Sequence, residues 1–163
     1  MTPFDAAPEG DGDRIVTRAG GLHVRQIDPI KRTVDFVAST DSIDSYGDRV
    51  VQNWRLDRYL ANPVVLFGHM SRELPIGRSL RTEVVAGRLE CTVEFAPAKL
   101  NQVAEDVFQM ILGGFIKAVS VGFIPHTYGW MKEDDREVFV LDDNELYEIS
   151  VVTIPANADA LAK

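Results

Sequence analysis

The pattern of apolar and polar positions along the chain favours short β-strands. Two pairs of strand-like runs are each separated by a turn dipeptide, and each pair predicts a β-hairpin. The pairs are residues 21–27 with 31–40, and residues 75–85 with 87–95. Asp28-Pro29 marks the first turn and Ala86-Gly87 the second, and apolar residues alternate in the last of the four runs. A further apolar run at residues 64–69 predicts another strand.

One segment, residues 97–114, has the apolar spacing of a helix. Its apolar residues recur at intervals of three and four and trace a single stripe: Leu100, Val103, Ala104, Val107, Met110 and Ile111. Pro97 near its start and Gly113-Gly114 at its end are helix boundary signals. The stripe predicts a helix packed against a sheet. Residues 54–63 predict one or two helical turns that end before Pro63.

The chain after the helix returns to strand-like patterning. Its short runs are residues 115–124, 128–131, 137–141 and 145–154, with a charged turn at 132–137. Seven to nine strands with one principal helix predict a mainly β fold with α elements, a closed β-barrel or a sandwich with helical decoration. Residues 1–13 are rich in Pro, Gly and Asp, so we expect a flexible leader before a single domain over residues 14–163.

Composition and charge narrow the classes of function. A chain of 163 residues fits one domain that can bury a core without disulfides. With 17 Lys and Arg against 25 Asp and Glu, the net charge of -8 has the wrong sign for binding nucleic-acid phosphates. No apolar run approaches the roughly 20 residues that span a bilayer, and the N-terminus lacks the pattern of a signal peptide. We therefore expect a cytoplasmic protein with no nucleic-acid or membrane partner.

The single cysteine, Cys91, excludes an intrachain disulfide and lies in a strand-like run, so we expect a buried structural thiol. Imidazole chemistry is limited to His23, His69 and His126. His69 ends the apolar run 64–69 beside a glycine, where a general base could stand, although a histidine that only caps a strand is the alternative. We expect His23 and His126 at the surface.

Ser120 is a candidate nucleophile. On a strand it shares a face with Ala118 and Gly122, whose small size leaves room for a substrate backbone. A serine hydroxyl needs a general base within hydrogen-bond reach, and His69 is the best base available. The alternative is an ordinary strand serine that bonds to a backbone carbonyl.

Glu148 lies in a strand that is apolar on both faces from Ile149 onward. A carboxylate in such a strand needs a partner, because burying an unpaired charge costs on the order of several kcal/mol. That partner is either an imidazole that Glu148 orients or an arginine in a structural salt bridge. Glu145, which opens the same strand, is the second candidate for orienting a histidine.

The spacing of metal-binding residue types argues against a metal site. The histidines occur in neither HExxH nor HxH spacing, and Asp41, Asp44 and Asp48 lack the ligand register of a calcium loop. We interpret that Asp-rich segment as a loop with local turn bonds. The sequence predicts no metal and no other cofactor.

Four segments, in this order, resemble the phage prohead, or head-maturation, serine proteases, which are distant relatives of the herpesvirus assemblin proteases. They are DSYGD at residues 44–48 followed by Val50-Val51, PVVLFGH at 63–69 with Pro75-Ile76-Gly77, AVSVGF at 118–123, and EISVVTIPAN at 148–157. The resemblance covers about residues 20–160, and it depends on the order and spacing of the motifs more than on any one of them.

The resemblance implies a closed β-barrel flanked by helices, and a serine protease whose catalytic histidine precedes its serine. It assigns the base to His69 and the nucleophile to Ser120. The third member follows the serine in this family, and Glu148 matches that place better than His126. The implied substrates are a scaffold protein or the scaffolding region of the capsid protein, cleaved inside the immature phage head in a bacterial host, with self-cleavage. Self-association of the protease inside the procapsid is left open.

Two functions from other classes remain alternatives. The first is a non-catalytic capsid-assembly or scaffold-binding module in which Ser120 is only a strand serine. The second is a hydrolase that uses a metal-bound water held by His69 and nearby carboxylates. An unreactive Ser120 would favour the first, whereas loss of activity on chelation would favour the second.

Overall fold

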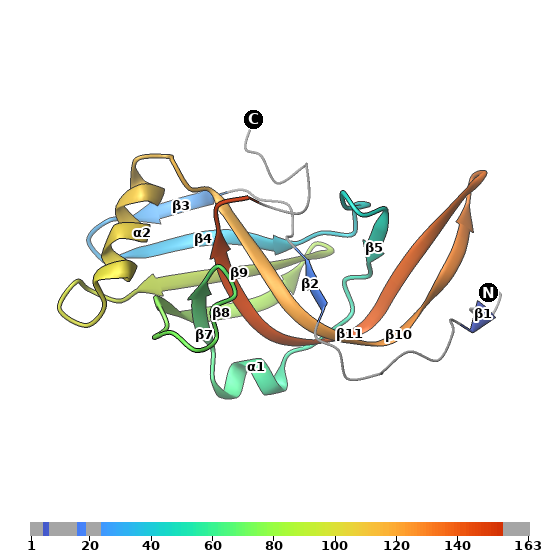
Figure 1. Cartoon of the computed structure of the whole chain (residues 1–163), viewed down its shortest axis with the longest axis horizontal. Helices are drawn as coiled ribbons and strands as arrows, with labels where there is room; N and C mark the ends of the chain where they lie inside the picture. Colours follow the sequence, from blue (N-terminus) through green and yellow to red (C-terminus); the bar gives the residue numbers. More distant parts are fainter. Residues whose placement is uncertain (1–4, 7–15, 19–23, 155–163) are drawn as a thin grey trace.

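The computed structural model describes residues 5–6, 16–18 and 24–154, and these form one mixed sheet with two short helices (Figure 1). The strands are β1 (Asp5–Ala6), β2 (Val16–Arg18), β3 (Val24–Asp28), β4 (Thr33–Ser39), β5 (Asp48–Val50), β6 (Trp54–Arg55), β7 (Val64–Phe67), β8 (Gly77–Val85), β9 (Arg88–Phe95), β10 (Ala118–Glu133) and β11 (Arg136–Val152). The helices are α1 (Asp57–Ala61) and α2 (Gln102–Leu112). The leader predicted for residues 1–13 lies outside the described residues, apart from β1.

Both predicted hairpins are confirmed where the structure describes them. β3 and β4 pair antiparallel, and in the turn between them Asp28 Oδ1 accepts hydrogen bonds from the backbone N–H groups of Ile30 and Lys31. β8 and β9 also pair antiparallel. Ala86 and Gly87 between them both have positive φ, 49° and 73°, as a tight two-residue hairpin turn requires.

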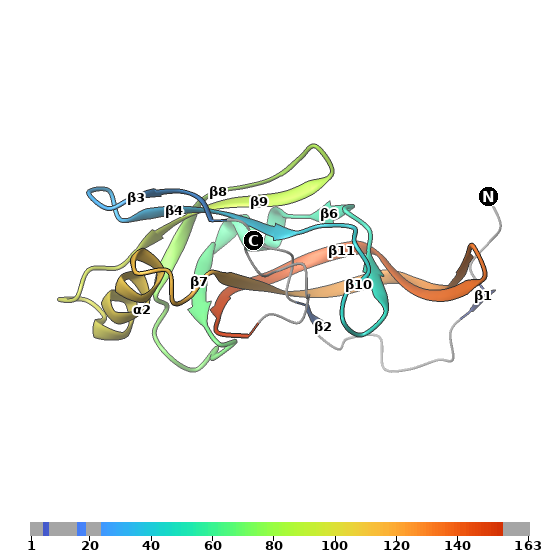
Figure 2. The ribbon, with the colours of Figure 1, turned by 90° about the horizontal axis from the view of Figure 1, so that it is seen from above.

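The C-terminal half differs from the prediction of several short strands. β10 and β11 are single strands of 16 and 17 residues, and together they form a long hairpin whose distal part projects from the body (Figures 1 and 2). The predicted charged turn at residues 132–137 is the tip of this hairpin. The strands remain continuous because a register shift between Gly122 and Phe123 and a proline opposite Asn144 interrupt the pairing only locally.

β11 pairs with four other strands and thereby positions the end of β7. β10 pairs antiparallel with one edge of it, while β5, β6 and β7 pair in parallel with the other edge, opposite residues 139–141, 144–145 and 149–151. The chain between β5 and β7 therefore follows β11 from the hairpin towards its end. This arrangement brings the end of β7, and the histidine that follows it, to the last residues of β11.

The predicted closed barrel is not formed. The sheet order is β1-β10-β11-β7-β8-β9-β4-β3, with β2 beside β10, and in the described residues no hydrogen-bonded ladder joins the two ends of this path. The reason is that β1 and β2 already pair with the outer edge of β10, while β3 pairs with the outer edge of β4. The fold is therefore a mainly β mixed sheet.

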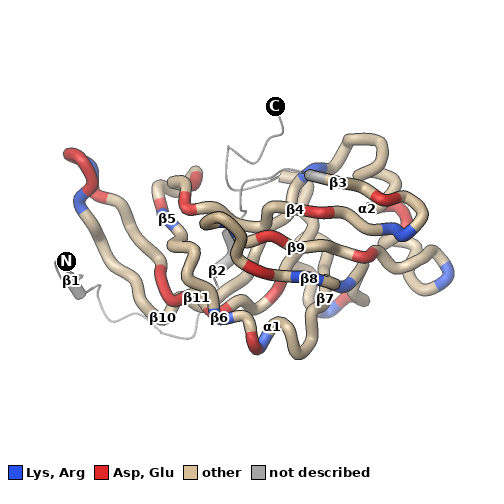
Figure 3. The backbone as a smooth tube through the Cα atoms, turned by 180° about the vertical axis from the view of Figure 1, so that it is seen from behind, with Lys and Arg blue, Asp and Glu red and all other residues tan. Residues whose placement is uncertain are grey.

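Charges of both signs lie close together over the surface. Figure 3 shows acidic residues on most strands and at the tip of the β10–β11 hairpin, with basic residues among them. Arg49 pairs with Glu133 and Arg78 with Glu94, each at 2.6 Å. Much of the charge on the described surface is thus paired, in spite of the net charge of -8.

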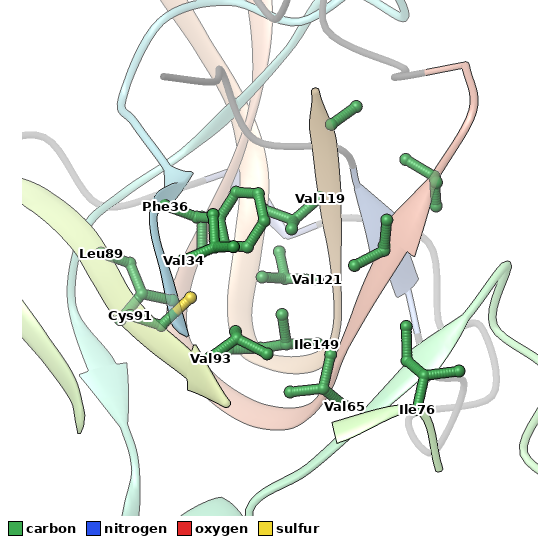
Figure 4. Packing of buried hydrophobic residues seen from close by; sticks show 14 of the residues in the cluster. Val34, Phe36, Val65, Ile76, Leu89, Cys91, Val93, Val119, Val121 and Ile149 are labelled. Carbon is green, nitrogen blue, oxygen red and sulfur yellow. The ribbon is translucent and has the colours of Figure 1, made fainter. Parts of the chain in front are cut away.

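The sheet is curled, and part of the core lies between β4 and β10, which face each other across it. Figure 4 shows Val34 and Phe36 of β4 beside Val119 and Val121 of β10, and all four are at most 1 % exposed. β4 and β10 thus pack through side chains although they are not hydrogen-bonded to each other. Since alternate residues of a strand face opposite sides, Ser120 must face away from Val119 and Val121.

Helix α2 packs against the sheet, as predicted, and half of the predicted stripe is buried. The buried residues are Ala104, Val107, Phe108 and Ile111. Leu100 lies before the helix, and Val103 and Met110 are exposed by 48 % and 45 %. The helix is rotated so that Phe108 enters the core, where its ring lies 5.3 Å from that of Phe95. No helix in the described part of the chain is long and apolar enough to cross a membrane.

Candidate active site

His69 stands in a turn that is fixed to the end of β11. Gly68 and His69 both adopt the left-handed conformation, with φ of 61° and 63°. The N–H of Gly68 donates to the carbonyl oxygen of Val151 at 2.9 Å, and the N–H of His69 donates to Ser150 Oγ at 3.2 Å. A non-glycine residue with such a φ is strained. The two hydrogen bonds hold this strained turn, and with it the imidazole, against β11.

The carboxylate of Glu148 has both oxygens engaged. Oε1 is hydrogen-bonded to His69 Nδ1, and Oε2 accepts a hydrogen bond from Ser150 Oγ at 2.5 Å. Glu148 is only 8 % exposed, so it is a buried carboxylate with a partner, as its strand predicts. The alternative salt bridge is wrong for the described residues, since no arginine pairs with Glu148 among them.

Ser120 lies on the neighbouring strand, on the same face of the sheet as this pair. In the β10–β11 ladder Ser120 is opposite Ser150, and Gly122 is opposite Glu148. Ser120 is 3 % exposed. Among the described residues no side-chain hydrogen bond is formed by its hydroxyl, either to His69 or to a backbone carbonyl. The structure thus places Glu148 and Ser120 on adjoining strands, and His69, in the turn after β7, is in direct contact with Glu148.

Gly122 has a different use from the one predicted. A Cβ atom at this position would lie 2.8 Å from both Cγ and Oε1 of Glu148. The space left by the missing side chain is therefore filled by the glutamate, and it is not open to a substrate backbone. The register shift that follows Gly122 lies next to this contact, a common position for a β-bulge near a functional site.

The other candidates lie in other surroundings. Glu145 is bound by His126 Nε2 at 3.0 Å and by Arg58 at 3.4 Å, and these partners, His126 first, lower the pKa of the Glu145 carboxyl. His126 is exposed, as expected, whereas His23 lies outside the described residues. Cys91 is fully buried, and burial raises the pKa of its thiol to about 12, which confirms a structural rather than a nucleophilic cysteine.

The Asp-rich loop is held by local turn bonds, as predicted. Asp44 Oδ1 accepts hydrogen bonds from the backbone N–H groups of Tyr46 and Asp48, at 2.8 and 3.0 Å. Within the described ranges no group of three or more His, Cys, Asp or Glu side chains is arranged to hold a metal ion.

Two cavities open near the ends of the strands. One of about 340 Å³ is lined by Phe67 and Met70, on either side of the Gly68-His69 turn, and by residues that follow it and by the start of α2. The other, of about 610 Å³, lies between β8, β9 and the segment before α2. Neither cavity is lined by His69, Ser120 or Glu148, but the smaller one is lined by residues on both sides of the turn that carries His69, so it lies nearer to the candidate site.

Ser150 contacts both His69 and Glu148, and the sequence analysis did not single it out. Its position two residues after Glu148 was the available signal, because residues i and i+2 of a strand share a face. A serine in a mostly apolar strand is too common for that spacing alone to reveal its contacts. Only the pairing of β7 with β11 shows that its hydroxyl meets the backbone of His69.

The geometry can support proton transfer and nucleophilic attack. When Nδ1 of an imidazole is held by a carboxylate, Nε2 is the nitrogen that can accept a proton. A serine hydroxyl on the adjoining strand is the group that such a base would activate.

Comparison with known proteins agrees with this chemistry. Residues 36–163 match the family described as Caudovirus prohead serine protease. The chain is 33 % identical to the prohead protease of Escherichia phage T5 over 129 residues, which are 76 % of this chain and 58 % of that protein. It is 28 % identical to the capsid polyprotein of Pseudomonas phage PAJU2 over 143 residues, which are 85 % of this chain and 21 % of the polyprotein.

The chain thus spans less than two thirds of the length of either relative. No solved structure matches it. The family match covers most of the chain, including all of β5 to β11, and it includes the three residues brought together above. The chain belongs to the Caudovirus prohead serine protease family.

Proposed function

We propose that this chain is a serine endopeptidase that acts through Ser120, His69 and Glu148. Ser120 Oγ attacks the carbonyl carbon of a peptide bond while His69 Nε2 takes the hydroxyl proton. The protonated ring returns this proton to the leaving amine as the C–N bond breaks, and an acyl-enzyme remains. A water molecule, deprotonated by the same ring, then hydrolyses the ester and restores the Ser120 hydroxyl.

One observation carries this proposal: the carboxylate that holds His69 Nδ1 lies on the same sheet face as Ser120, one strand away. In this mechanism Glu148 fixes the ring tautomer and stabilises the imidazolium formed in the first step. Ser120 and His69 are not hydrogen-bonded to each other in the structure, and catalytic hydrogen bonds are often long without substrate and shorten when substrate binds.

We further propose that the substrate is the capsid protein of the same phage or its scaffold, cleaved inside the immature head in the bacterial cytoplasm, with cleavage of the protease itself. Two names support this choice. One relative is a prohead protease, and the other is a capsid polyprotein of which the matching region is about a fifth. In such a polyprotein the region that matches this chain is joined covalently to the rest of a capsid polyprotein.

The first experiment compares the wild type with Ser120→Ala, each co-expressed with the phage capsid protein so that shells assemble. We expect the wild type to shorten the capsid or scaffold chain and Ser120→Ala to leave it at full length, as intact masses would show. Ser39→Ala is the matched control, because Ser39 is also a buried strand serine, 2 % exposed, and lies on β4. Cleavage by Ser120→Ala would contradict the assignment of the nucleophile.

A second measurement needs no substrate. A fluorophosphonate reagent adds covalently to an activated serine, so it should add one group to the wild type and none to Ser120→Ala, and peptide mapping should find it on Ser120. Shells that assemble and remain uncut, together with an unlabelled Ser120, would instead support the non-catalytic assembly module. Cleavage that is lost with a chelator but retained in Ser120→Ala would support a metal-bound water.

The role of Glu148 is tested by Glu148→Gln, which keeps the shape of the side chain but removes its charge. We expect cleavage and labelling to slow by roughly 10²–10⁴-fold, because an amide neither stabilises the imidazolium nor enforces the tautomer. Glu145→Gln on the same strand is the control and should retain the wild-type rate. A normal rate in Glu148→Gln with a slow rate in Glu145→Gln would move the role to Glu145.

A further inference from the structure

We infer that Ser150 is a positioning residue of this site, which holds both the base and the carboxylate that orients it. This inference rests on the proposed function of His69 and Glu148. Ser150 Oγ donates its proton to Glu148 Oε2 at 2.5 Å, and the same oxygen accepts the backbone N–H of His69 at 3.2 Å. Ser150 is 0 % exposed, so its hydroxyl is out of contact with bulk solvent.

The first bond fixes the carboxylate. The terminal torsion of a glutamate has a broad energy profile, so contact with one oxygen alone does not define the plane of the carboxylate. With Oε1 on His69 Nδ1 and Oε2 on Ser150 Oγ, both oxygens are held and the plane is defined. On the remaining side Gly122 leaves the space in which Glu148 lies. Ser150 therefore determines the direction in which the carboxylate meets the ring.

The second bond fixes the backbone of the base. His69 has φ of 63°, a conformation that an L-residue keeps only when the surroundings hold it. Its N–H lies in a half-buried turn, where its only acceptor among the described residues is Ser150 Oγ. If that acceptor is removed, one of the two bonds that backbone N–H groups of this turn donate to β11 is lost, and the N–H of His69 loses its partner.

The two bonds use different capacities of one hydroxyl, since a serine oxygen donates one proton and accepts through its lone pairs. Ser150 thus couples the orientation of the Glu148 carboxylate to the position of the His69 backbone. A small displacement of a base from its productive position is costly, and a shift of about 1 Å lowers rates by roughly 10²-fold. We therefore expect loss of the hydroxyl to act on the rate while the sheet stays folded.

The test uses the full chain and the rate at which a fluorophosphonate labels Ser120. Ser150→Ala should slow labelling by roughly 10²-fold relative to the wild type. Ser150→Thr and Ser150→Val form the decisive pair, because they add nearly the same bulk to a buried position and differ in the hydroxyl. Ser150→Thr should label at least ten-fold faster than Ser150→Val. Equal rates for this pair, or a wild-type rate in a folded Ser150→Ala, would overturn the inference.

A spectroscopic measurement separates this inference from the proposed function. Ring N–H signals of ¹⁵N-histidine should include one from His69 Nδ1, assigned by its loss in His69→Gln, that exchanges slowly with water. It should persist in Ser150→Thr and exchange faster in Ser150→Val. If the wild type neither labels nor cleaves, the proposed function fails, and this signal still decides whether Ser150 holds the ring. An unchanged signal in Ser150→Val would refute the positioning role.

Discussion

Glu148 occupies a space that only a glycine on the neighbouring strand leaves open. A Cβ at Gly122 would lie 2.8 Å from Cγ and Oε1 of Glu148, and real Cβ atoms do not approach other atoms so closely. Gly122 does not have a positive φ, so its backbone conformation does not require glycine. The constraint at this position is therefore steric, and the three atoms nearest to such a Cβ all belong to Glu148.

This predicts a specific coupling between the two positions. Gly122→Ala should lower the free energy of unfolding by roughly 1–3 kcal/mol, because Glu148 must move or the strands must separate. In a Glu148→Ala background the same substitution should cost much less, since Cγ and the carboxylate are gone. Urea unfolding of the four proteins measures the coupling. Equal costs in both backgrounds would mean that the clash is with another group.

The sequence predicted which residues belong to the site, but it did not predict all of the contacts between them. His69, Ser120 and Glu148 each stood out as a polar residue in apolar surroundings, and the structure places Ser120 and Glu148 on adjoining strands with His69 in contact with Glu148. Their catalytic roles stay predictions. The contact of Gly122 with Glu148 could not be foreseen, because it depends on which residues of β10 and β11 are opposite each other, and the sequence does not define that register.

Among the elements, α2 was predicted as a helix, and three residues of its predicted stripe are buried: Ala104, Val107 and Ile111. Several apolar positions made two neighbouring stripes possible, and the observed one is set by tertiary contacts of Phe108. Its ring packs on Phe95, and the guanidinium of Arg32 lies 4.6 Å above it. Arg32 also pairs with Glu105 at 2.8 Å and donates to the carbonyl oxygen of Phe95. This network fixes the rotation of the helix.

The assignment of the buried face can be tested by two substitutions on α2. Phe108→Ala should lower the free energy of unfolding by about 3–5 kcal/mol, because it leaves a cavity between the helix and β9. Val103→Ala, on the predicted but exposed side, should change it by less than about 0.5 kcal/mol. Chemical unfolding followed by circular dichroism gives both values. Similar losses for the two variants would support the stripe predicted from the sequence.

Elements with local signals were predictable and those that depend on distant pairing were not. The β3–β4 and β8–β9 hairpins carry their turn residues in the sequence, so both were recognised. The continuity of β10 through Pro125 was missed, because a proline usually ends a strand. It persists here since β11 supports the strand on both sides of the proline.

The whole molecule differs most from the prediction in its closure. The number of strands suggested a barrel, yet whether the sheet closes depends on which strands occupy its edges. β1 and β2 come from the first 18 residues and pair with residues 129–130 and 121–123 of β10, so part of the edge available for closure is already used. No pattern within β10 or β4 encodes this, because it is a competition between distant segments for the same N–H and C=O groups.

Paired surface charges predict how the stability of the whole molecule depends on pH. Arg55 beside Asp143 lowers the pKa of that carboxyl, and His126 and Arg58 lower the pKa of Glu145. Hydrogen bonds from Gln109, and then Arg32, likewise lower the pKa of Glu105. In each case the folded pKa lies below the unfolded value of about 4, so the ionised carboxylate favours the folded state. Its contribution is complete above that value and is lost as the pH falls through the folded pKa.

We therefore expect the urea midpoint to change little between pH 7 and about pH 5 and to fall progressively below about pH 4. The double variant Asp143→Asn, Glu145→Gln should have a lower midpoint at pH 7 and a smaller fall on acidification, because two of the carboxylates responsible are absent. High salt should reduce the difference between the two proteins at pH 7, since these groups are near the surface. The measurement is a series of urea titrations at several pH values. A parallel fall in both proteins would mean that other carboxyl groups control acid stability.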